Sequence, residues 1–311
     1  MRKLDYIFIA VCCLVVTACE VEFDLKGLDD DPLFLLDGCV GIDPYRYGGD
    51  LQMYLYAVPS VSGEREFSEE ARCTLKVYKN SELIDIKDYI TVESFYGLIV
   101  GNYSVEYGDE FVVTAESEGF PMATARTVIP QAAPVVDASY SMSDGDLNVR
   151  FSFEDDGTTE DAYALCFRTI SLDREPADEQ VGTSIALPFG YSPESSFLDA
   201  GPFDVSWTDG DLYYGISDAT FSGKRKEFEV TIPDIVSGLD PYRETTYFRI
   251  ELQRISPERL RYEIACNDKG NNALGFIGLA PVTFAYTNVS GGSGCFSAAS
   301  TVYTDWVEIQ Q

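Results

Sequence analysis

The sequence predicts an all-β protein made of two β-sandwich domains, with one short helix in the second domain. Three observations predict this class. Apolar and β-branched residues alternate with polar ones over many short stretches, which is typical of half-buried strands. Turn-forming residues separate these stretches. A proline-bounded link at residues 131–137 divides the chain into two β-rich parts.

The first domain is predicted over residues 33–132, without a helix. Strands are expected at residues 33–42, 51–59, 71–80, 110–117 and 122–130. The alternation continues from residue 96, and Tyr107-Gly108-Asp109 has the composition of a turn between strands. These segments predict a meander.

The second domain is predicted over residues 133–311. Residues 137–156 predict two strands around an Asp144-Gly145-Asp146 turn. Further strands are expected at residues 161–172, 224–233 and 246–255, and within residues 281–310. Short strands of this kind are typical of immunoglobulin/fibronectin-like sandwiches.

Two segments of the second domain depart from this strand pattern. Residues 256–268 predict the helix, because Ser256 suits the N-cap and Pro257 the first helical position. Leu260, Ile264 and Cys266 then share roughly one helix face. Residues 173–210 form a long insertion with four prolines, and loops of this length are usually functional or mobile.

Residues 1–18 have the pattern of a lipoprotein signal peptide. Arg2 and Lys3 precede an uncharged apolar run over residues 6–18, which is too short to span a bilayer. Cys19 directly follows Val-Thr-Ala, which resembles a bacterial lipobox, so we expect cleavage before Cys19 and lipidation of its thiol, including palmitate. An ordinary signal peptide cut elsewhere, or an uncleaved apolar anchor, is the alternative.

The lipidated tether is predicted over residues 19–32. Its Glu20, Glu22 and Asp24 resemble the signal that sends lipoproteins of Bacteroidota to the outer face of the outer membrane, and a merely solvated tether is the alternative. Several acyl chains on one residue anchor a protein stably, because each buried methylene adds about 0.8 kcal/mol. We therefore expect a protein anchored by lipid to the outer membrane, at the cell surface or on the periplasmic face.

The composition limits the classes of function. The chain of 311 residues carries a formal net charge of −30 and contains no histidine. A chain this negative repels phosphate backbones, so no nucleic-acid partner is expected. Without histidine it lacks the commonest general base and metal ligand. We therefore expect a protein that is not an enzyme and that uses no cofactor and no metal.

The cysteines beyond Cys19 are Cys39, Cys73, Cys166, Cys266 and Cys295. No CxxC pair occurs among them, which argues against a zinc or redox site. In an oxidising compartment, buried thiols with one or two disulfides are expected. The pairs Cys39 with Cys73 and Cys266 with Cys295 are the first to test.

Aromatic residues in loops are the candidate ligand-binding side chains. They are Tyr45 and Tyr47 in DPYRYGG, Tyr191 in the insertion, Trp207, Tyr213 and Tyr214. Amphipathic rings supply contact area for a sugar or a peptide at low entropic cost. Packing in the core or in edge strands is the alternative for many of them.

Acidic and glycine-rich segments suggest further sites. Carboxylates that suit calcium occur at residues 29–31, at residues 154–156, and at Asp209 with Asp211. None has EF-hand spacing, so solvated loops are expected. The glycines of NVSGGSGCF suit an anion-binding nest, but a tight turn re-entering the sheet is the favoured interpretation because no GK[ST] follows. Asp218 in SDATFSG is expected to cap its turn.

Several segments occur in the order found in a known family. ARCTLKVYKN, YGDEFVVTAES and ARTVIPQAAPVV, followed by ISDATFSGKRKEFEV, LQRISPERLRYE and PVTFAYTNVSGGSGCFSAAS, resemble the domain of unknown function 4249 family. The resemblance covers nearly the whole chain after Cys19. It implies a lipoprotein of Bacteroidota, often encoded near TonB-dependent outer-membrane transporters, for which no catalytic residues are recognised.

The expected function is that of a non-catalytic accessory or binding protein of the cell envelope, associated with a TonB-dependent outer-membrane receptor. The receptor is implied by the family resemblance alone. One alternative is a carboxylate-dependent glycan hydrolase, with two acids facing each other in a cleft lined by aromatics. Another is a structural adhesion module with an exposed apolar patch and no pocket.

Overall fold

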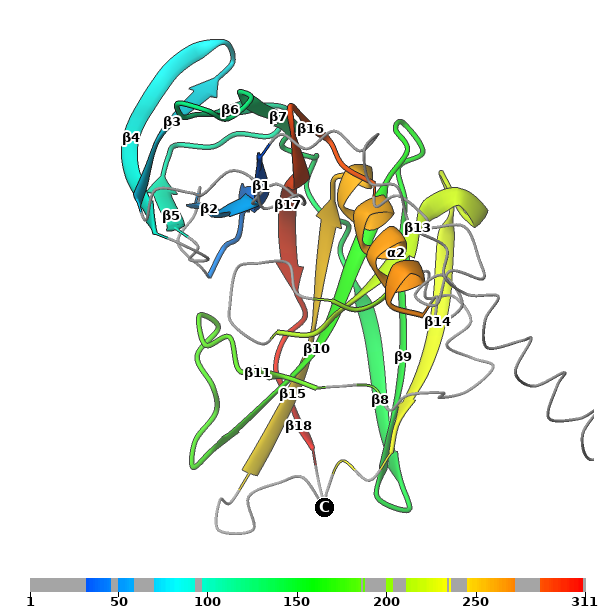
Figure 1. The fold of residues 1–311 in the computed structure, drawn as a ribbon. Helices are drawn as coiled ribbons and strands as arrows, with labels where there is room; N and C mark the ends of the chain where they lie inside the picture. Colours follow the sequence, from blue (N-terminus) through cyan, green and yellow to red (C-terminus); the bar gives the residue numbers. More distant parts are fainter. Residues whose placement is uncertain are drawn as a thin grey trace, which may run out of the picture.

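In the computed structural model, one large sheet runs through the molecule and two smaller sheets pack against it (Figure 1). The structure describes residues 32–45, 50–58, 70–92, 97–185, 187, 200–203, 211–233, 235, 245–271 and 286–309. The all-β class predicted from the sequence is confirmed. The immunoglobulin/fibronectin-like type of the sandwiches stays a prediction.

The large sheet contains ten strands. They are β1 (Leu33–Ile42), β2 (Asp50–Val58), β5 (Gly97–Asn102), β10 (Ala162–Leu172), β11 (Thr183–Ser184), β12 (Ala200–Phe203), β13 (Tyr213–Ser217), β15 (Thr245–Ile255), β17 (Gly292–Tyr303) and β18 (Val307–Ile309). Their order is β12-β13-β10-β15-β17-β1-β2-β5, with β11 beside β10 and β18 beside β15. The strands predicted at residues 33–42, 161–172 and 246–255 are therefore confirmed.

The N-terminal sandwich is formed by β1, β2 and β5 of the large sheet and a five-stranded sheet. The smaller sheet contains β16 (Val289–Ser290), β7 (Ala123–Val128), β6 (Glu110–Glu116), β3 (Glu70–Lys79) and β4 (Glu82–Val92), in that order. The fully buried residues between the sheets include Phe34, Leu36, Leu51, Met53, Leu75, Val77, Phe111 and Val113. Each such side chain contributes about 1.5–3 kcal/mol by leaving water, so alternate residues of both sheets hold the two layers together.

The C-terminal sandwich is formed by β10 and β15 of the large sheet and a three-stranded sheet. The smaller sheet contains β14 (Arg225–Ile232), β9 (Asp146–Glu154) and β8 (Asp137–Ser143), in that order. Phe228 stacks on Phe151 and Phe153 with ring centroids 5.0 and 5.2 Å apart, and these rings pack in one core with residues of β10 and β15. The predicted turn between β8 and β9 is confirmed, because Asp144 and Gly145 have φ angles of 54° and 90°, as in a type I′ hairpin turn.

Strand β17 joins the two sandwiches. It lies parallel to β1, with Phe296 beside Gly38, and its last residues pair antiparallel with β15. Phe296, together with Val289 of β16, is part of the N-terminal core. The sandwich predicted over residues 33–132 therefore includes strands from the C-terminal segment, and the link near residue 132 does not separate two independent units.

The glycines around the start of β17 are required by close approach to neighbouring strands. Gly291 has a φ of +72°, and a Cβ atom there would collide with the carbonyl oxygen of Met122. Gly294 has a φ of +103°, and a Cβ atom there would collide with the carbonyl oxygen of Leu36. Only glycine tolerates both conditions at low cost. The expected tight turn re-entering the sheet is thus confirmed.

Helix α2 (Pro257–Asn271) covers part of one face of the large sheet (Figure 1). It confirms the helix predicted at residues 256–268. Leu260 and Ile264 pack with Ile255 and other residues of the sheet in a third apolar cluster. The hydroxyl of Ser256 accepts a hydrogen bond from the Ala298 backbone N–H at 3.3 Å, so its side chain fixes the helix start to β17. Among the described residues, no helix is long and apolar enough to cross a membrane.

The expected disulfides are wrong, because all five cysteines of the described chain are free. Cys39 lies in the apolar cluster under α2, whereas Cys73 lies in the core of the N-terminal sandwich. These are opposite sides of β1, so the two thiols do not meet. Burial raises the pKa of Cys39 to about 12 and that of Cys73 to about 11, so both are packed, protonated thiols of low reactivity.

Candidate functional site

The candidate site is an open groove where the two sandwiches meet. Its volume is about 510 Å³. One wall is the end of β7 and the link after it, residues 126–131, and the other is the end of β15 and the start of α2, residues 255–258. The remaining lining residues are Gly108, Thr159, Glu160, Asp161, Tyr286 and Asn288. The groove therefore depends on both halves of the chain.

The groove combines an exposed apolar position with an acidic rim. Val128 is 44% exposed. Glu160, Asp161 and Glu258 are acidic, and the basic lining residue, Arg126, forms an ion pair with Glu110 outside the groove. Opposite charges attract and like charges repel at such short range, so the groove favours a neutral or basic ligand over an acidic one.

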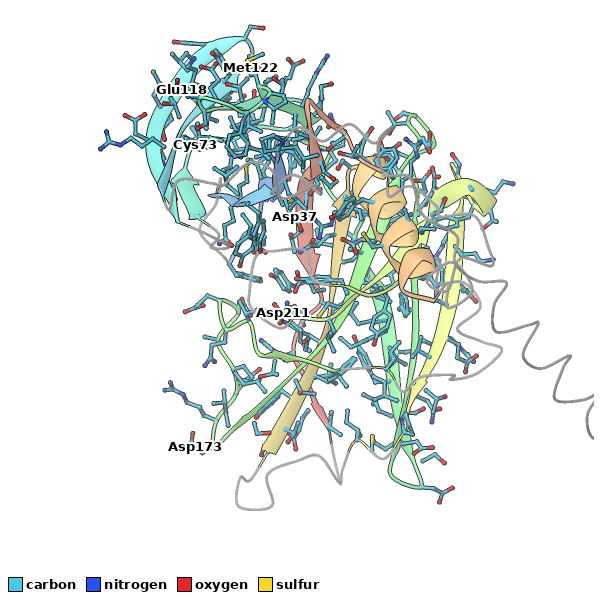
Figure 2. All side chains as sticks on the ribbon, in the orientation of Figure 1. Asp37, Cys73, Glu118, Met122, Asp173 and Asp211 are labelled. Atoms are coloured by element: carbon cyan, nitrogen blue, oxygen red, sulfur yellow. The ribbon has the colours of Figure 1, made fainter. Side chains whose placement is uncertain are left out.

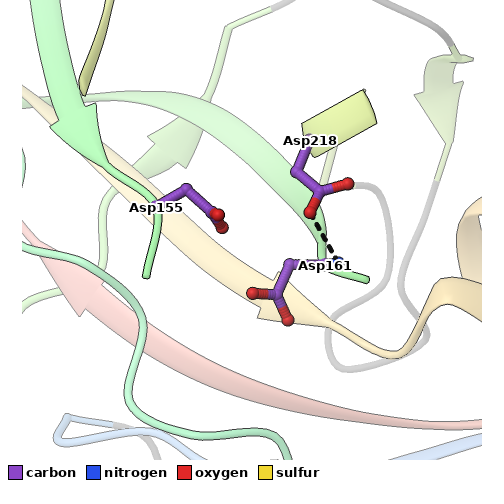
Figure 3. A group of neighbouring side chains, drawn as sticks. All are labelled: Asp155, Asp161 and Asp218. Carbon is purple, nitrogen blue, oxygen red and sulfur yellow. Dashed lines mark hydrogen bonds between the residues drawn. The ribbon is translucent and has the colours of Figure 1, made fainter. Parts of the chain in front are cut away.

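Asp161 connects the groove to a cluster of three buried aspartates (Figure 3). Asp155 follows β9, Asp161 precedes β10, and Asp218 begins the short 3₁₀ helix η2 (Asp218–Thr220). The Asp161 backbone N–H donates to Asp218 Oδ2 at 3.0 Å, and the Asp218 N–H donates to the Asp161 carbonyl at 3.2 Å. This reciprocal pair fixes the start of β10 against η2.

The expectation that Asp218 caps its own turn is wrong. Its carboxylate accepts from Asp161, far away in the sequence. The side chain of Ser217 instead accepts a hydrogen bond from the Ala219 backbone N–H at 3.2 Å, which is the position of an N-cap. Asp218 is therefore free to join two separate segments.

Asp155 is held as a carboxylate by protein donors. Its Oδ1 accepts from the Tyr163 hydroxyl at 2.5 Å, and its Oδ2 accepts from the backbone N–H groups of Gly157 and Gly223 at 2.8 and 2.7 Å. Burial by itself raises the pKa of the Asp155 carboxyl, but these hydrogen bonds outweigh it and lower the pKa.

Asp161 has the opposite electrostatic environment. The pKa of its carboxyl is raised to about 6, and burial is the largest cause. A hydrogen bond from Thr159 and the charge of Arg254 lower the pKa, whereas neighbouring Asp155 contributes to the rise. A carboxyl with a pKa near neutrality in a groove is a candidate acid or base. This makes Asp161 the most chemically distinctive residue of the groove.

The aspartate cluster fits a hydrogen-bonded ion network better than a metal centre. The guanidinium of Arg254 lies where a cation would neutralise the acids. Its Nη2 is 2.9 Å from Asp156 Oδ2 and 2.9 Å from Asp161 Oδ2, the latter an ion pair without hydrogen-bond geometry. Since a calcium ion takes several carboxylate and carbonyl oxygens and those of Asp155 are already used, the arginine supplies the compensating charge.

A second buried network lies on the other face of the large sheet. Arg168 of β10 donates Nη1 and Nη2 to Asp211 at 3.0 and 2.8 Å, and Nε to Glu251 of β15. In the view of Figure 2, Asp211 lies between Asp37 and Asp173. The hydroxyl of Tyr213 donates to Glu251 Oε1 at 2.7 Å. Asp211, which was considered as a calcium ligand but expected in a solvated loop, is thus buried and paired with an arginine.

The aromatic residues predicted to bind a ligand lie in different environments. Tyr213 and Tyr214 lie in strand β13, not in a loop, and are 0% and 4% exposed. Their expected loop placement is therefore wrong, and the alternative of packing applies to them. Tyr45 is half-buried, and its ring lies 5.0 Å from that of Tyr303. Cys19, Tyr47, Tyr191 and Trp207 lie outside the described residues.

Several buried charged residues of the large sheet were missed by sequence reasoning. Arg168, Arg249 and Glu251 occupy polar positions in strands whose alternation predicts one solvent-facing side. In the structure this side is also buried, and these three residues are 0%, 1% and 0% exposed. Alternation alone does not distinguish a solvent-exposed polar face from a buried one, so the sequence pattern did not indicate that these charged side chains are buried.

Comparisons with known proteins found only distant structural similarities. No protein family model matches the chain, and no curated protein matches it. Among solved structures, it is similar to a red sea bream transglutaminase, with 9% identity and a TM-score of 0.23 over 72% of this chain and 29% of that one. It is also similar to a Corynebacterium diphtheriae protein described as membrane anchored, with 11% identity and a TM-score of 0.23 over 71% and 54% of the two chains. Likenesses this distant support no argument about function.

Proposed function

We propose that this chain is a lipid-anchored protein of the cell envelope that binds a partner or ligand without catalysis, through the groove between its sandwiches. The groove itself is the observation that carries the binding role. Both halves of the chain build it, it exposes an apolar side chain at Val128, and its acidic rim selects by charge. Concave sites at the junction of two structural units are common binding sites.

The anchor part of the proposal comes from the sequence. Cys19 follows a charged and then apolar segment of signal-peptide character. Mass spectrometry of the mature protein is expected to find an acylated Cys19 at the N-terminus, and Cys19→Ala is expected to leave the membrane fraction. An unmodified N-terminus, or a Cys19→Ala variant that still pellets with membranes, contradicts the anchor without affecting the groove.

The partner that fits the proposal is a TonB-dependent outer-membrane receptor, which is implied by the family resemblance. A lipid anchor restrains both proteins to one membrane plane, so a weak contact gains effective concentration. Protease treatment of intact cells then tests the surface location. Digestion only after lysis assigns the protein to the periplasmic face.

Co-purification after mild extraction tests the groove. Val128→Asp places a charge on the exposed apolar position of the groove, and we expect about a tenfold loss of receptor recovered with the protein, as for a central contact. Val135→Asp is the matched control, because Val135 is 80% exposed and does not line the groove. Recovery of the wild-type protein alone, or equal effects of both substitutions, contradicts the proposal.

The glycan hydrolase is the second candidate, and one observation favours it. Asp161 lines the groove, and its pKa of about 6 suits a general acid near neutral pH. This function predicts turnover of a glycan that is lost in Asp161→Asn and retained in Asp173→Asn, which alters an exposed acid outside the groove. Turnover with this pattern replaces the non-catalytic proposal.

A further inference from the structure

Arg249 of β15 is buried in a box of aromatic rings on the helix-bearing side of the large sheet. The centre of its guanidinium lies 4.1 Å from the ring of Tyr303, 4.3 Å from that of Trp306 and 5.4 Å from that of Tyr45. The side chain is 1% exposed. Cations are attracted to ring faces at such distances, so the rings hold the guanidinium in place.

Asp43 fixes two rings of this box. Its Oδ2 accepts a hydrogen bond from the Tyr303 hydroxyl at 2.8 Å, and its Oδ1 accepts from the Tyr45 backbone N–H at 2.9 Å. The third ring, Trp306, packs against Gly182, where a Cβ atom would lie 2.8 Å from the indole. The box is therefore assembled from three separate parts of the chain.

The donors of Arg249 are only partly used. Its Nη1 donates to the Asp178 carbonyl oxygen at 3.0 Å. Its Nε and Nη2 are buried and have no hydrogen-bond partner, and neither has the indole Nε1 of Trp306. Buried donors without a partner are rare in folded proteins and indicate a missing water, ion or ligand.

The acid that follows Arg249 on the same face of β15 is engaged by other residues. Glu251 lies two residues along the same strand, but Arg168 donates to its Oε2, and Tyr213 and Gln253 donate to its Oε1. No ion pair within 4.0 Å joins Arg249 to a carboxylate in the described part of the chain. Burial lowers the pKa of Arg249, which is the effect of a charge with too little compensation.

The free donors have the geometry of a specific ligand group. Nε–H and one N–H of Nη2 are parallel and lie on one edge of the guanidinium, so together they match the two oxygens of a carboxylate. Tyr45, Tyr303 and Trp306 are each half-buried. Part of each ring therefore remains accessible to solvent, whereas Arg249 is buried behind them.

We propose that Arg249 binds the carboxylate of a small organic acid through Nε and Nη2, with Tyr45, Tyr303 and Trp306 as the walls of the site and Trp306 Nε1 as a further donor. This site is separate from the groove, because none of its four residues lines the groove. It also does not depend on the lipid anchor. Failure of the groove or anchor experiments therefore leaves it intact.

Titration with sodium benzoate tests the site. The chain has two tryptophans, so in full-length Trp207→Phe protein in detergent the fluorescence of Trp306 reports on the box. We expect a saturable change with benzoate and a rise in the thermal midpoint at constant ionic strength. Benzamide, which has the same ring without the charge, is expected to give neither effect.

Variants distinguish the fork from general effects of the salt. Arg249→Lys retains the charge but not the parallel donors, and we expect about tenfold weaker benzoate binding or more. Trp306→Phe retains a ring but loses the indole donor, and weaker binding is expected by calorimetry. Arg225→Lys is the control, because Arg225 is exposed and lies in β14.

Three results overturn the proposal. They are the absence of any saturable benzoate effect, equal effects of benzamide, and binding that persists unchanged in Arg249→Met. Far-UV circular dichroism of each variant shows whether it is folded. If Arg249→Met is unfolded, Arg249→Lys decides, since it keeps the cation between the rings.

Discussion

Strand β15 buries two arginines on opposite faces, and they are compensated in different ways. Arg254 is 2% exposed, and its guanidinium contacts the carboxylates of Asp156 and Asp161. Arg249 is 1% exposed, and its guanidinium contacts aromatic rings, a single backbone carbonyl and no carboxylate among the described residues. The charge of Arg254 is therefore neutralised by carboxylates within the fold, whereas two donor atoms of Arg249 have no partner.

This difference suggests a criterion for telling a buried charge that stabilises the fold from one that serves a binding site. Removing a charged group from water costs several kcal/mol, on the order of what a good ion pair returns. Around Arg254, ion pairs with the neighbouring acids offset this desolvation penalty. Around Arg249 the desolvation penalty is only partly offset, and natural proteins tolerate such a deficit mainly where a ligand completes the site. The three predictions below test this contrast in order of expected effect.

The largest effect is expected for Arg254→Met. This substitution leaves Asp155, Asp156 and Asp161 close together without their cation, so the free energy of unfolding at neutral pH should fall by about 3–5 kcal/mol. Urea unfolding followed by circular dichroism measures it. Arg225→Met, which breaks an exposed pair with Asp137, should cost under about 1 kcal/mol. A similar small loss for both variants would show that the aspartate network is not held by Arg254.

An intermediate effect of opposite sign is expected for Asp161→Asn. Its carboxyl has a pKa raised from 3.8 to about 6 in the folded protein, so the folded state holds the proton more tightly than the unfolded state. Ionising this group therefore destabilises the fold, and the penalty develops as the pH rises from about 4 to about 6. The variant should be about 1–3 kcal/mol more stable than the wild type above this range.

The pH dependence of this gain is the critical measurement. Near pH 3, below both pKa values, the carboxyl is mostly protonated and neutral in both states, so Asp161→Asn and the wild type should unfold at similar urea concentrations. The facing groups are Arg254 and Asp155, with Thr159 donating to the same carboxyl. A difference that does not change between about pH 3 and pH 8 contradicts the burial of an ionisable Asp161.

The smallest effect is expected for Arg249→Met. Losing the contact with the aromatic rings costs about 1–2 kcal/mol, but removing a buried charge that lacks a carboxylate partner offsets this loss. The free energy of unfolding should therefore stay within about 1 kcal/mol of the wild type. A loss as large as that of Arg254→Met would make Arg249 a structural cation and remove the contrast between the two arginines.

The sequence was sufficient for elements whose cause is local. The strands at residues 71–80 and 246–255 follow from period-2 alternation, and the helix start follows from the suitability of Pro257 for the first helical position. The tight turn at Gly291 follows from the need for a positive φ. Strand β4, with its charged sequence ELIDIKDYITV, was not predicted, because its pairing with β3 rather than its own pattern makes it a strand.

The sequence by itself determined the β class, the positions of the strands with a clear local pattern, the tight turns, and the acidic, histidine-free composition of the chain, because these depend on residues close together in the sequence. Only the tertiary structure decided that β17 lies against β1, that both faces of β15 are buried, and that Cys39 and Cys73 point to different cores. These features arise from pairing between distant segments. A period of two specifies two faces of a strand, but the neighbouring segments decide what covers each face.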